Sequence, residues 1–383
     1  MLLSHSWSFT MLQLCGLSRP RQWFSGWKKY FYNSLTIFSS LCIYVFTLTG
    51  LVKIITSPSF GEAARSSFMA LTMFGVSCKI ANWILRSNDI IIVMEILNND
   101  VCRPRGNEEL AIQTKFDNLS RTNTMFFGGI AEGIVIDVTI TSLLENIAQR
   151  TLPFPAWFPF DCTSDWKFWI AFLHQILAHG IAANIGTFHD TFFHEIMIQA
   201  RAKLNILKFR LRSIPEAIEK PHLKNKDNDG ERKKSRLYSQ LQEEIYKFVK
   251  KSNEVFNIVL LVQFSVSAFV ICMSTYMLSK LTIHSPEFIF IVVYLLSMIL
   301  QIFLMCWHGN EVIVESMDVR NAIYDMDWCS LGPNSKKDLH LMMTRTYYRL
   351  EYTTSHLITL SLESYNSLLK LSYSMYNLLQ TST

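Results

Sequence analysis

The chain has 383 residues, of which 50% are hydrophobic and 13% aromatic but only 17% charged. Soluble domains average about 25% charged residues, so this composition leaves too little polar surface for a set of soluble domains. Disorder is excluded because disordered chains are rich in charge and poor in aromatic residues, and eight cysteines are too few for a disulfide scaffold. The net charge of +5 is small, so the positions of the charges carry more information than their sum.

Seven segments are long and apolar enough to be membrane helices. A helix crosses a hydrocarbon layer of about 30 Å with about 20 mostly apolar residues. The predicted spans are 30–52, 66–85, 124–144, 168–188, 255–278, 288–307 and 357–379. The third and seventh are the least apolar, since the third contains Glu132 and Asp137 and the seventh contains Glu363 and Lys370. The sequence therefore predicts an all-α, polytopic membrane protein with seven transmembrane helices.

The charged residues inside the spans have alternative interpretations. Lys79 lies near one end of the second span and is expected to snorkel to the membrane surface. Glu132 and Asp137 either face a ligand cavity or pair with another helix, because ionisable groups in a bilayer are costly. Gly133, between them, permits close approach of a helix or leaves room for a small ligand.

The distribution of basic residues sets the expected orientation. Lys and Arg are concentrated before the first span and between the fourth and fifth spans, and the loops on the other side are poor in them. The positive-inside rule places basic segments in the cytoplasm, so we expect a cytoplasmic N-terminus and an extracellular C-terminus. A G-protein-coupled receptor has an external N-terminus, and this charge asymmetry disfavours it.

The segments outside the membrane are expected to be largely helical. Helical spacing of apolar residues continues past the fourth and sixth spans and leads into the fifth, which predicts a cytoplasmic helical bundle. A charged stretch over 220–235 is expected to be a mobile loop. The chain has no Gly-rich phosphate loop, no G-x-S-x-G and no H-E-x-x-H motif. We therefore expect no enzyme activity, no cofactor, no metal and no nucleic-acid partner.

The seventh span carries a continuous polar stripe. Its members recur at spacings of four and three, which places them on one face of a helix: Glu363, Ser367, Lys370, Ser374, Asn377 and Thr381. Lipid cannot cover such a face without a large cost. The stripe therefore either packs on polar partners or lines water, and a water-filled pore shared between subunits is the sharper of these two hypotheses.

The segment 360–379 reads L-S-L-E-S-Y-N-S-L-L-K-L-S-Y-S-M-Y-N-L-L. It resembles the closing signature, S-L-E-x-F followed by K-x-S-Y-S-x-x-x-L-L, of the insect odorant receptors, specifically their divergent ligand-selective subunits. Tyr365 stands where that family often has Phe. Further segments resemble other family patterns: Gln301 to Asn310, Glu315-Ser316, Ala322 to Trp328, Gln263-Phe264 with Cys272, and Phe188-His189-Asp190. The resemblance covers nearly the whole chain.

The resemblance implies a function and an assembly. It implies an odorant receptor subunit of a ligand-gated, non-selective cation channel, assembled as a heterotetramer with the odorant receptor co-receptor. The expected location is the plasma membrane of olfactory sensory neurons, and the expected partners include a small volatile odorant, membrane lipid and permeating cations. A gustatory-type chemoreceptor channel is the alternative, but this chain lacks the T-Y…Q-F ending of those receptors.

The resemblance also implies the positions of a pore and a pocket. In the pore, Leu378 corresponds to the hydrophobic gate and Thr381 to the polar position one turn further out, with Ser374 and Asn377 beneath them. The polar stripe and the family pattern differ on whether Asn377 or Leu378 points at the pore axis. The odorant pocket is expected in the outer half of helices two, three, four and six. Depth along the spans gives its candidates: Phe68, Thr72, Met73, Gly133, Ile136, Asp137, Ile140, Trp169, Phe172, Leu173, Ile176, Ile291 and Tyr294.

These expectations divide the chain into six regions. They are a cytoplasmic N-terminal segment (1–29), helices one to four with the odorant-binding bundle (30–188), a cytoplasmic helical extension with the mobile loop (189–254), helices five and six (255–307), cytoplasmic anchor helices (308–356) and the pore-lining helix seven (357–383).

Overall fold

The computed structural model describes residues 3, 6–20, 23, 26–160, 164–218, 228–282, 285–355 and 357–382. The helices are α1 (Trp7–Leu14), α2 (Trp27–Ile55), α3 (Phe60–Leu85), α4 (Ser87–Leu97), α5 (Asn107–Thr141), α6 (Ile147–Gln149), α7 (Asp165–Ile218), α8 (Asn228–Lys280), α9 (Pro286–Tyr324), α10 (Pro333–Arg345) and α11 (Leu362–Ser382). Short helical turns lie at η3 (Asp100–Cys102), η4 (Ser142–Asn146) and η6 (Trp328–Ser330), and the strands are β1 (Thr353–Thr354) and β2 (Ile358–Thr359). Within these residues the chain is almost entirely helical, as predicted.

Among the described residues, six helices are long and apolar enough to cross a membrane. They contain the first six predicted spans and correspond to α2, α3, α5, α7, α8 and α9. The seventh predicted span forms the 21-residue α11, whose polar residues lower its hydropathy below that of the others. The prediction of a polytopic, all-α membrane protein is therefore confirmed, and the orientation of its termini stays a prediction.

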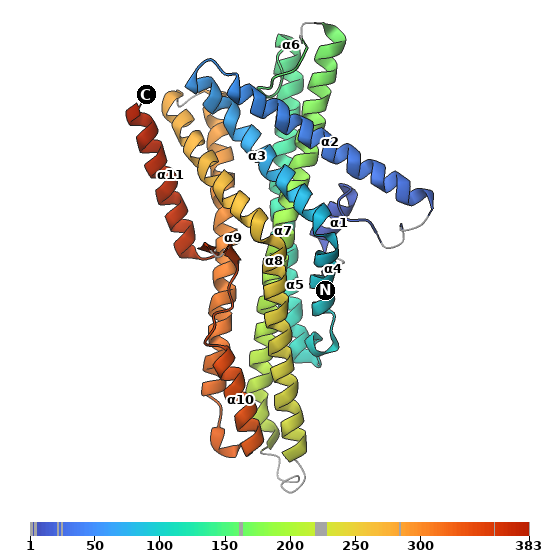
Figure 1. Cartoon of the computed structure of the whole chain (residues 1–383), viewed down its shortest axis with the longest axis vertical. Coiled ribbons are helices and arrows are strands. Elements are labelled where there is room, and N and C mark those ends of the chain that lie inside the picture. Colours follow the sequence, from blue (N-terminus) through green and yellow to red (C-terminus); the bar gives the residue numbers. More distant parts are fainter. Residues whose placement is uncertain are drawn as a thin grey trace.

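Three helices are far longer than a bilayer requires. α7 has 54 residues, α8 has 53 and α9 has 39, and at 1.5 Å per residue the first two reach about 80 Å. Figure 1 shows their lower halves running together beyond α2 and α3, with α10 at the same end. We call this part the stalk; it is the helical bundle that the periodicity predicted. Of the stretch expected to be a mobile loop, 220–227 lie outside the described residues and 228–235 begin α8.

Buried ion pairs hold the stalk together. The Arg210 guanidinium donates to both carboxylate oxygens of Glu109, at 2.9 and 2.7 Å, and this pair joins α7 to the start of α5. The same guanidinium donates to the carbonyl oxygens of Val101 and Arg103, at 3.0 and 2.8 Å. Arg210 is 2% exposed and Glu109 is 7% exposed. The basic run that indicated topology in the sequence is therefore also a packing surface.

A short hairpin places α11 against the bundle, at a position where the sequence predicts no strand. β1 and β2 pair antiparallel, with Thr353 opposite Thr359. The preceding Tyr352 is fully buried, and its hydroxyl lies 3.2 Å from the Ser252 hydroxyl of α8. Gly309 of α9 lets the chain pass closely, because a Cβ there would lie 2.6 Å from Leu360. Packing on α8 and α9 therefore forms the hairpin and delays the start of α11 to residue 362.

Replacing Arg210 tests the role of the buried ion pair. Arg210→Met removes the donors to Glu109 and to two carbonyl oxygens, and it leaves a buried carboxylate without its charge partner. We expect the free energy of unfolding to fall by about 3–5 kcal/mol, measured as a lower midpoint of thermal unfolding in detergent.

The matched control is Arg212→Met, on the exposed side of the same helix turn. Surface changes of this kind alter the free energy of unfolding by about 0.5 kcal/mol or less. Equal midpoints for the two variants would show that the pair does not stabilise the stalk.

Candidate functional site

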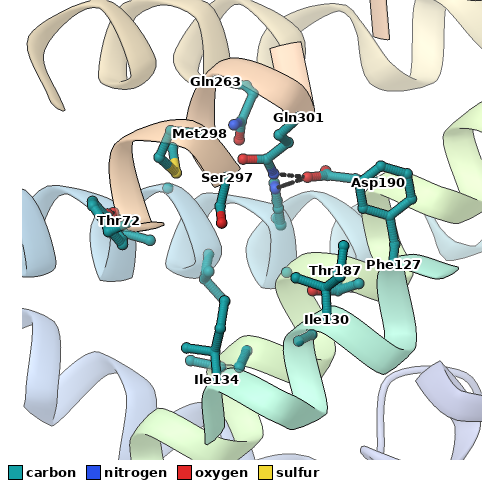
Figure 2. A pocket seen from close by; sticks show the side chains of 18 of the residues that line it. Thr72, Phe127, Ile130, Ile134, Thr187, Asp190, Gln263, Ser297, Met298 and Gln301 are labelled. Carbon is teal, nitrogen blue, oxygen red and sulfur yellow. Dashed lines mark hydrogen bonds and ion pairs between the residues drawn. The ribbon is translucent and has the colours of Figure 1, made fainter. Parts of the chain in front are cut away.

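A cavity of about 210 Å³ lies inside the bundle, between α3, α5, α7, α8 and α9. Its wall is mostly apolar, and its principal apolar members are Met69, Met73, Val76, Ile130, Ile134 and Met298. Figure 2 shows Thr72 towards one end and Asp190 with Gln301 towards the other, with Ser297 and Met298 of α9 between them. We call the end near Thr72 the outer end and the end near Asp190 the inner end.

Helical periodicity explains why these residues share one cavity. On α3, Met69, Thr72, Val76 and Lys79 follow one another at spacings of three and four, so they occupy one face. On α7, the residues that face α3 are small, so their side chains occupy little of the space between the two helices. A Cβ at Gly186 would lie 3.3 Å from a methyl group of Val76. α3 therefore packs closely on α7 at Gly186, and the cavity lies beside this contact.

The outer end is lined by aromatic rings and hydroxyl groups. The Tyr294 hydroxyl is hydrogen-bonded to the Thr72 hydroxyl, and it lies 3.3 Å from the carbonyl oxygen of Phe68. The rings of Phe68 and Tyr294 meet edge to face at 5.4 Å. Thr72 donates its own proton to the Phe68 carbonyl oxygen at 2.8 Å. The hydroxyl groups at this end are thus engaged with one another and with the backbone.

The inner end holds a buried ion pair. The Lys79 ammonium lies 2.7 Å from one carboxylate oxygen of Asp190 and 2.8 Å from the other. The side-chain amide of Gln301 also donates to Asp190, and Nδ1 of His189 lies 3.5 Å from it. Lys79 is 3% exposed and Asp190 is 4% exposed. This cluster joins α3, α7 and α9 and presents charge to an otherwise apolar space.

The loop before α7 is packed close to the cavity. The backbone N–H of Phe154 donates to the Gln175 side chain at 3.1 Å, and the Gln175 amide donates back to the Phe154 carbonyl oxygen at 3.0 Å. The Phe154 ring lies 5.1 Å from the ring of His179, which lines the cavity. The loop is therefore anchored on α7 beside the cavity wall.

Three of the predicted odorant-binding residues line this cavity: Thr72, Met73 and Tyr294. Phe68 packs on Tyr294 at its edge, and Ile291 belongs to a neighbouring apolar cluster with Tyr276 and Met277. The other candidates lie outside the lining: Gly133, Ile136, Asp137, Ile140, Trp169, Phe172, Leu173 and Ile176.

One physical reason explains why these candidates do not line the cavity. They follow from depth along a span, whereas lining a cavity also depends on how each helix is rotated about its axis. On α5, Ile136 is 56% exposed and Ile140 is 51% exposed, so these residues face away from α7. On α7, Leu173 is 53% exposed, while Phe172 packs against Phe168 at 5.7 Å. The cavity also reaches further towards the predicted cytoplasmic side than the outer-half pocket that the resemblance implies.

The role of Lys79 differs from the snorkelling that the sequence suggests. Lys79 points into the bundle and pairs with Asp190 instead of reaching the membrane surface. A signal for this pairing is present in the sequence. α3 and α7 run in the same direction; Lys79 lies near the end of the second predicted span, and Asp190 lies two residues beyond the end of the fourth. Periodicity and hydropathy are read along one helix at a time, so they do not show that opposite charges on two helices lie at the same level in the bundle.

The polar stripe of the seventh predicted span lies on the face of α11 that points away from the bundle. Glu363, Ser367, Lys370, Ser374 and Asn377 are all exposed, and Leu378 beside them is 70% exposed. The opposite face packs inward through Leu368 and Ser372, and the Ser372 hydroxyl donates to the Ala268 carbonyl oxygen of α8 at 3.3 Å. Thr381 lies in the last turn of α11, and its side chain lies outside the described residues.

The chain matches known proteins over most of its length. A family model described as 7tm Odorant receptor matches residues 59–373. Odorant receptor 10 of Aedes albopictus is 25% identical over 264 residues, which cover 68% of each chain. Odorant receptor 2a of Drosophila melanogaster is 22% identical over 381 residues, which cover 96% of this chain and 94% of the relative.

A solved structure has the same fold. It is that of the insect olfactory receptor OR5 from Machilis hrabei in complex with eugenol, with a TM-score of 0.86 over 98% of this chain and 96% of that one. The two sequences are 16% identical, so this likeness concerns the fold alone. The family model, in contrast, includes every helix that lines the cavity. This chain therefore belongs to the 7tm odorant receptor family.

Proposed function

We propose that this chain is the ligand-selective subunit of an odorant-gated, non-selective cation channel in the plasma membrane of olfactory sensory neurons. In this proposal it forms a heterotetramer with the odorant receptor co-receptor. The observation that carries the proposal is the combination, within one chain of this family, of an internal cavity and a helix with an outward polar stripe. The cavity suits a small ligand, and the polar stripe suits contact with water.

The cavity has the size and chemistry of a site for a small volatile molecule. Its volume of about 210 Å³ lies below the roughly 300–1,000 Å³ of drug-sized sites. Its apolar wall would favour a ligand through burial, at about 25 cal/mol per Å² of apolar surface. Small ligands bury little area, which predicts affinities in the micromolar range. OR5 from Machilis hrabei was solved in complex with eugenol, and we infer that this chain likewise binds a small molecule.

We infer that α11 lines the pore. In a tetramer with the exposed faces of four α11 helices turned to a common axis, Ser374, Asn377, Leu378 and Thr381 would form its narrow outer part. Lys370 would lie lower, where the pore is wider. Leu378 is the proposed hydrophobic gate.

We infer that α9 couples the cavity to the pore. α9 contributes Ser297, Met298 and Gln301 to the cavity, and two residues further along α9 the ring of Phe303 meets the Tyr365 ring of α11 at 5.4 Å. A ligand opens the channel only if it binds the open state better than the closed state. In this proposal an odorant in the cavity favours a position of α9 that moves α11 away from the axis.

The first test is electrical. Cells that express this chain together with the co-receptor are expected to pass an inward cation current when a broad odorant panel is applied, whereas cells with the co-receptor alone are not expected to respond to the same compounds. Whole-cell patch-clamp recording measures this. The channel proposal is wrong if the full-length chain reaches the plasma membrane and no compound evokes a current above that control.

The pore assignment is tested by two serines on opposite faces of α11. We expect Ser374→Cys to make the odorant-evoked current sensitive to a charged, membrane-impermeant thiol reagent, because this side chain would line water. Ser372→Cys is the matched control, since Ser372 is 2% exposed and packs on α8. The assignment would be contradicted if the reagent reduced the current of Ser372→Cys and left that of Ser374→Cys unchanged.

The cavity assignment is tested by filling it. Ser297→Phe adds a ring inside the cavity, so we expect the odorant concentration for half-maximal current to rise about tenfold or more, which corresponds to about 1.4 kcal/mol of lost binding. Ser265→Phe is the control, because Ser265 lies on the exposed face of α8. An unchanged dose–response curve for Ser297→Phe would place the odorant elsewhere.

A further inference from the structure

The ammonium group of Lys79 has more hydrogen-bond donors than its partner uses. An ammonium carries three N–H donors, and Lys79 lies 2.7 and 2.8 Å from the two carboxylate oxygens of Asp190. Within the described part of the chain, Asp190 is the hydrogen-bond and ion-pair partner of this nitrogen, and it makes no other hydrogen bond. Lys79 is 3% exposed and lines the cavity. One donor of a buried cation is therefore left for whatever occupies the cavity.

The neighbouring groups direct this donor and neutralise its charge. Both oxygens of Asp190 are engaged, one of them also by the Gln301 amide. Because the carboxylate balances the ammonium, the inner end carries a strong donor without a net charge. An added carboxylate would be repelled by Asp190, and an added ammonium would compete with Lys79. A neutral oxygen acceptor is neither repelled by Asp190 nor in competition with Lys79.

The rest of the cavity limits the number of polar groups in the ligand. The hydroxyl groups of Thr72 and Tyr294 at the outer end are already bonded to each other and to the Phe68 carbonyl oxygen. Between the ends the wall is largely methionine and aliphatic side chains, and the Ser297 hydroxyl there already donates its proton to the Val293 carbonyl oxygen at 2.8 Å. Thr72 and Lys79 are seven residues apart on one helix, or about 10 Å. A matching ligand is thus short, with an apolar body and one acceptor.

We propose that the inner end is a subsite selecting neutral, mono-oxygenated ligands such as ketones, aldehydes, esters and alcohols. The Lys79 ammonium, oriented by Asp190, donates a hydrogen bond to the ligand oxygen. Gln301 positions Asp190 and closes the subsite on the side of α9. This inference rests on the proposed function only in taking the cavity as the ligand site; it does not depend on channel activity.

The test uses five probes with the same seven-carbon body: heptane, 2-heptanone, 2-heptanol, heptanoic acid and heptylamine. Binding to the purified complex of this chain with the co-receptor is followed by thermal stabilisation, which reports affinity without requiring a current. A hydrogen bond to a charged donor predicts half-saturation by 2-heptanone at about a ten- to hundredfold lower concentration than by heptane. The acid and the amine are expected to bind more weakly than the ketone.

The decisive variant is Lys79→Met/Asp190→Leu/Gln301→Leu, which makes the inner end apolar. Removing the whole cluster avoids the isolated buried charge that a single change would leave, and such replacements are commonly tolerated. The advantage of 2-heptanone over heptane is expected to fall to within about threefold. Heptane should bind as it does to the unmodified chain, which also shows that the variant is folded.

Tyr294→Phe is the matched control, since it removes a polar group from the outer end of the same cavity. The ketone should keep its advantage in this variant. The proposal is overturned if the triple variant retains the preference, if Tyr294→Phe abolishes it, or if the unmodified complex binds heptane as tightly as 2-heptanone. The expected binding pattern without any evoked current would support the subsite and contradict the channel proposal.

Discussion

The ion pair between Lys79 and Asp190 constrains how α3, α7 and α9 align in the bundle. An unpaired charge inside a membrane-embedded bundle is very costly, so Lys79 and Asp190 must lie at the same depth. This condition fixes the height of α3 relative to α7. Gln301, which donates to the same carboxylate, places α9 at that level. Small residues of α7 precede Asp190 along the helix, and the cavity lies beside them.

The same electrostatic rule organises the stalk. Arg210 joins α7 to α5 through Glu109, and Arg201 joins α7 to α9 through Glu311 at 2.6 Å. Further along, Lys251 of α8 pairs with Asp89 of α4 at 2.7 Å. Three long helices would otherwise slide along one another, because apolar stripes repeat every turn and specify depth weakly. The charged contacts occur once each, so they select one alignment.

Features of the structure that depend on local sequence properties were predictable, and features that depend on packing between helices were not. Hydropathy and helical spacing are local properties, and they were sufficient for the first six spans, the stalk and the polar stripe of α11. The rotation of α5 was not predictable, because Ile136 and Val138 are equally apolar and only packing on α7 decides which one is buried. The hairpin before α11 escaped prediction for a related reason. Its two-residue strands have no periodicity, and contacts of Tyr352 and Leu360 with α8 and α9 stabilise them.

Most of the surface of α11 is left uncovered by the rest of the chain. One narrow face, with Leu368 and Ser372, packs on the bundle. Beside the exposed polar stripe, Leu371 is 54% exposed and Tyr373 is 63% exposed. Water suits the stripe but not these apolar side chains, and lipid suits the side chains but not the stripe. An assembly in which neighbouring subunits cover the apolar flanks and water fills the centre would satisfy both, and this supports the proposal that α11 lines a shared pore.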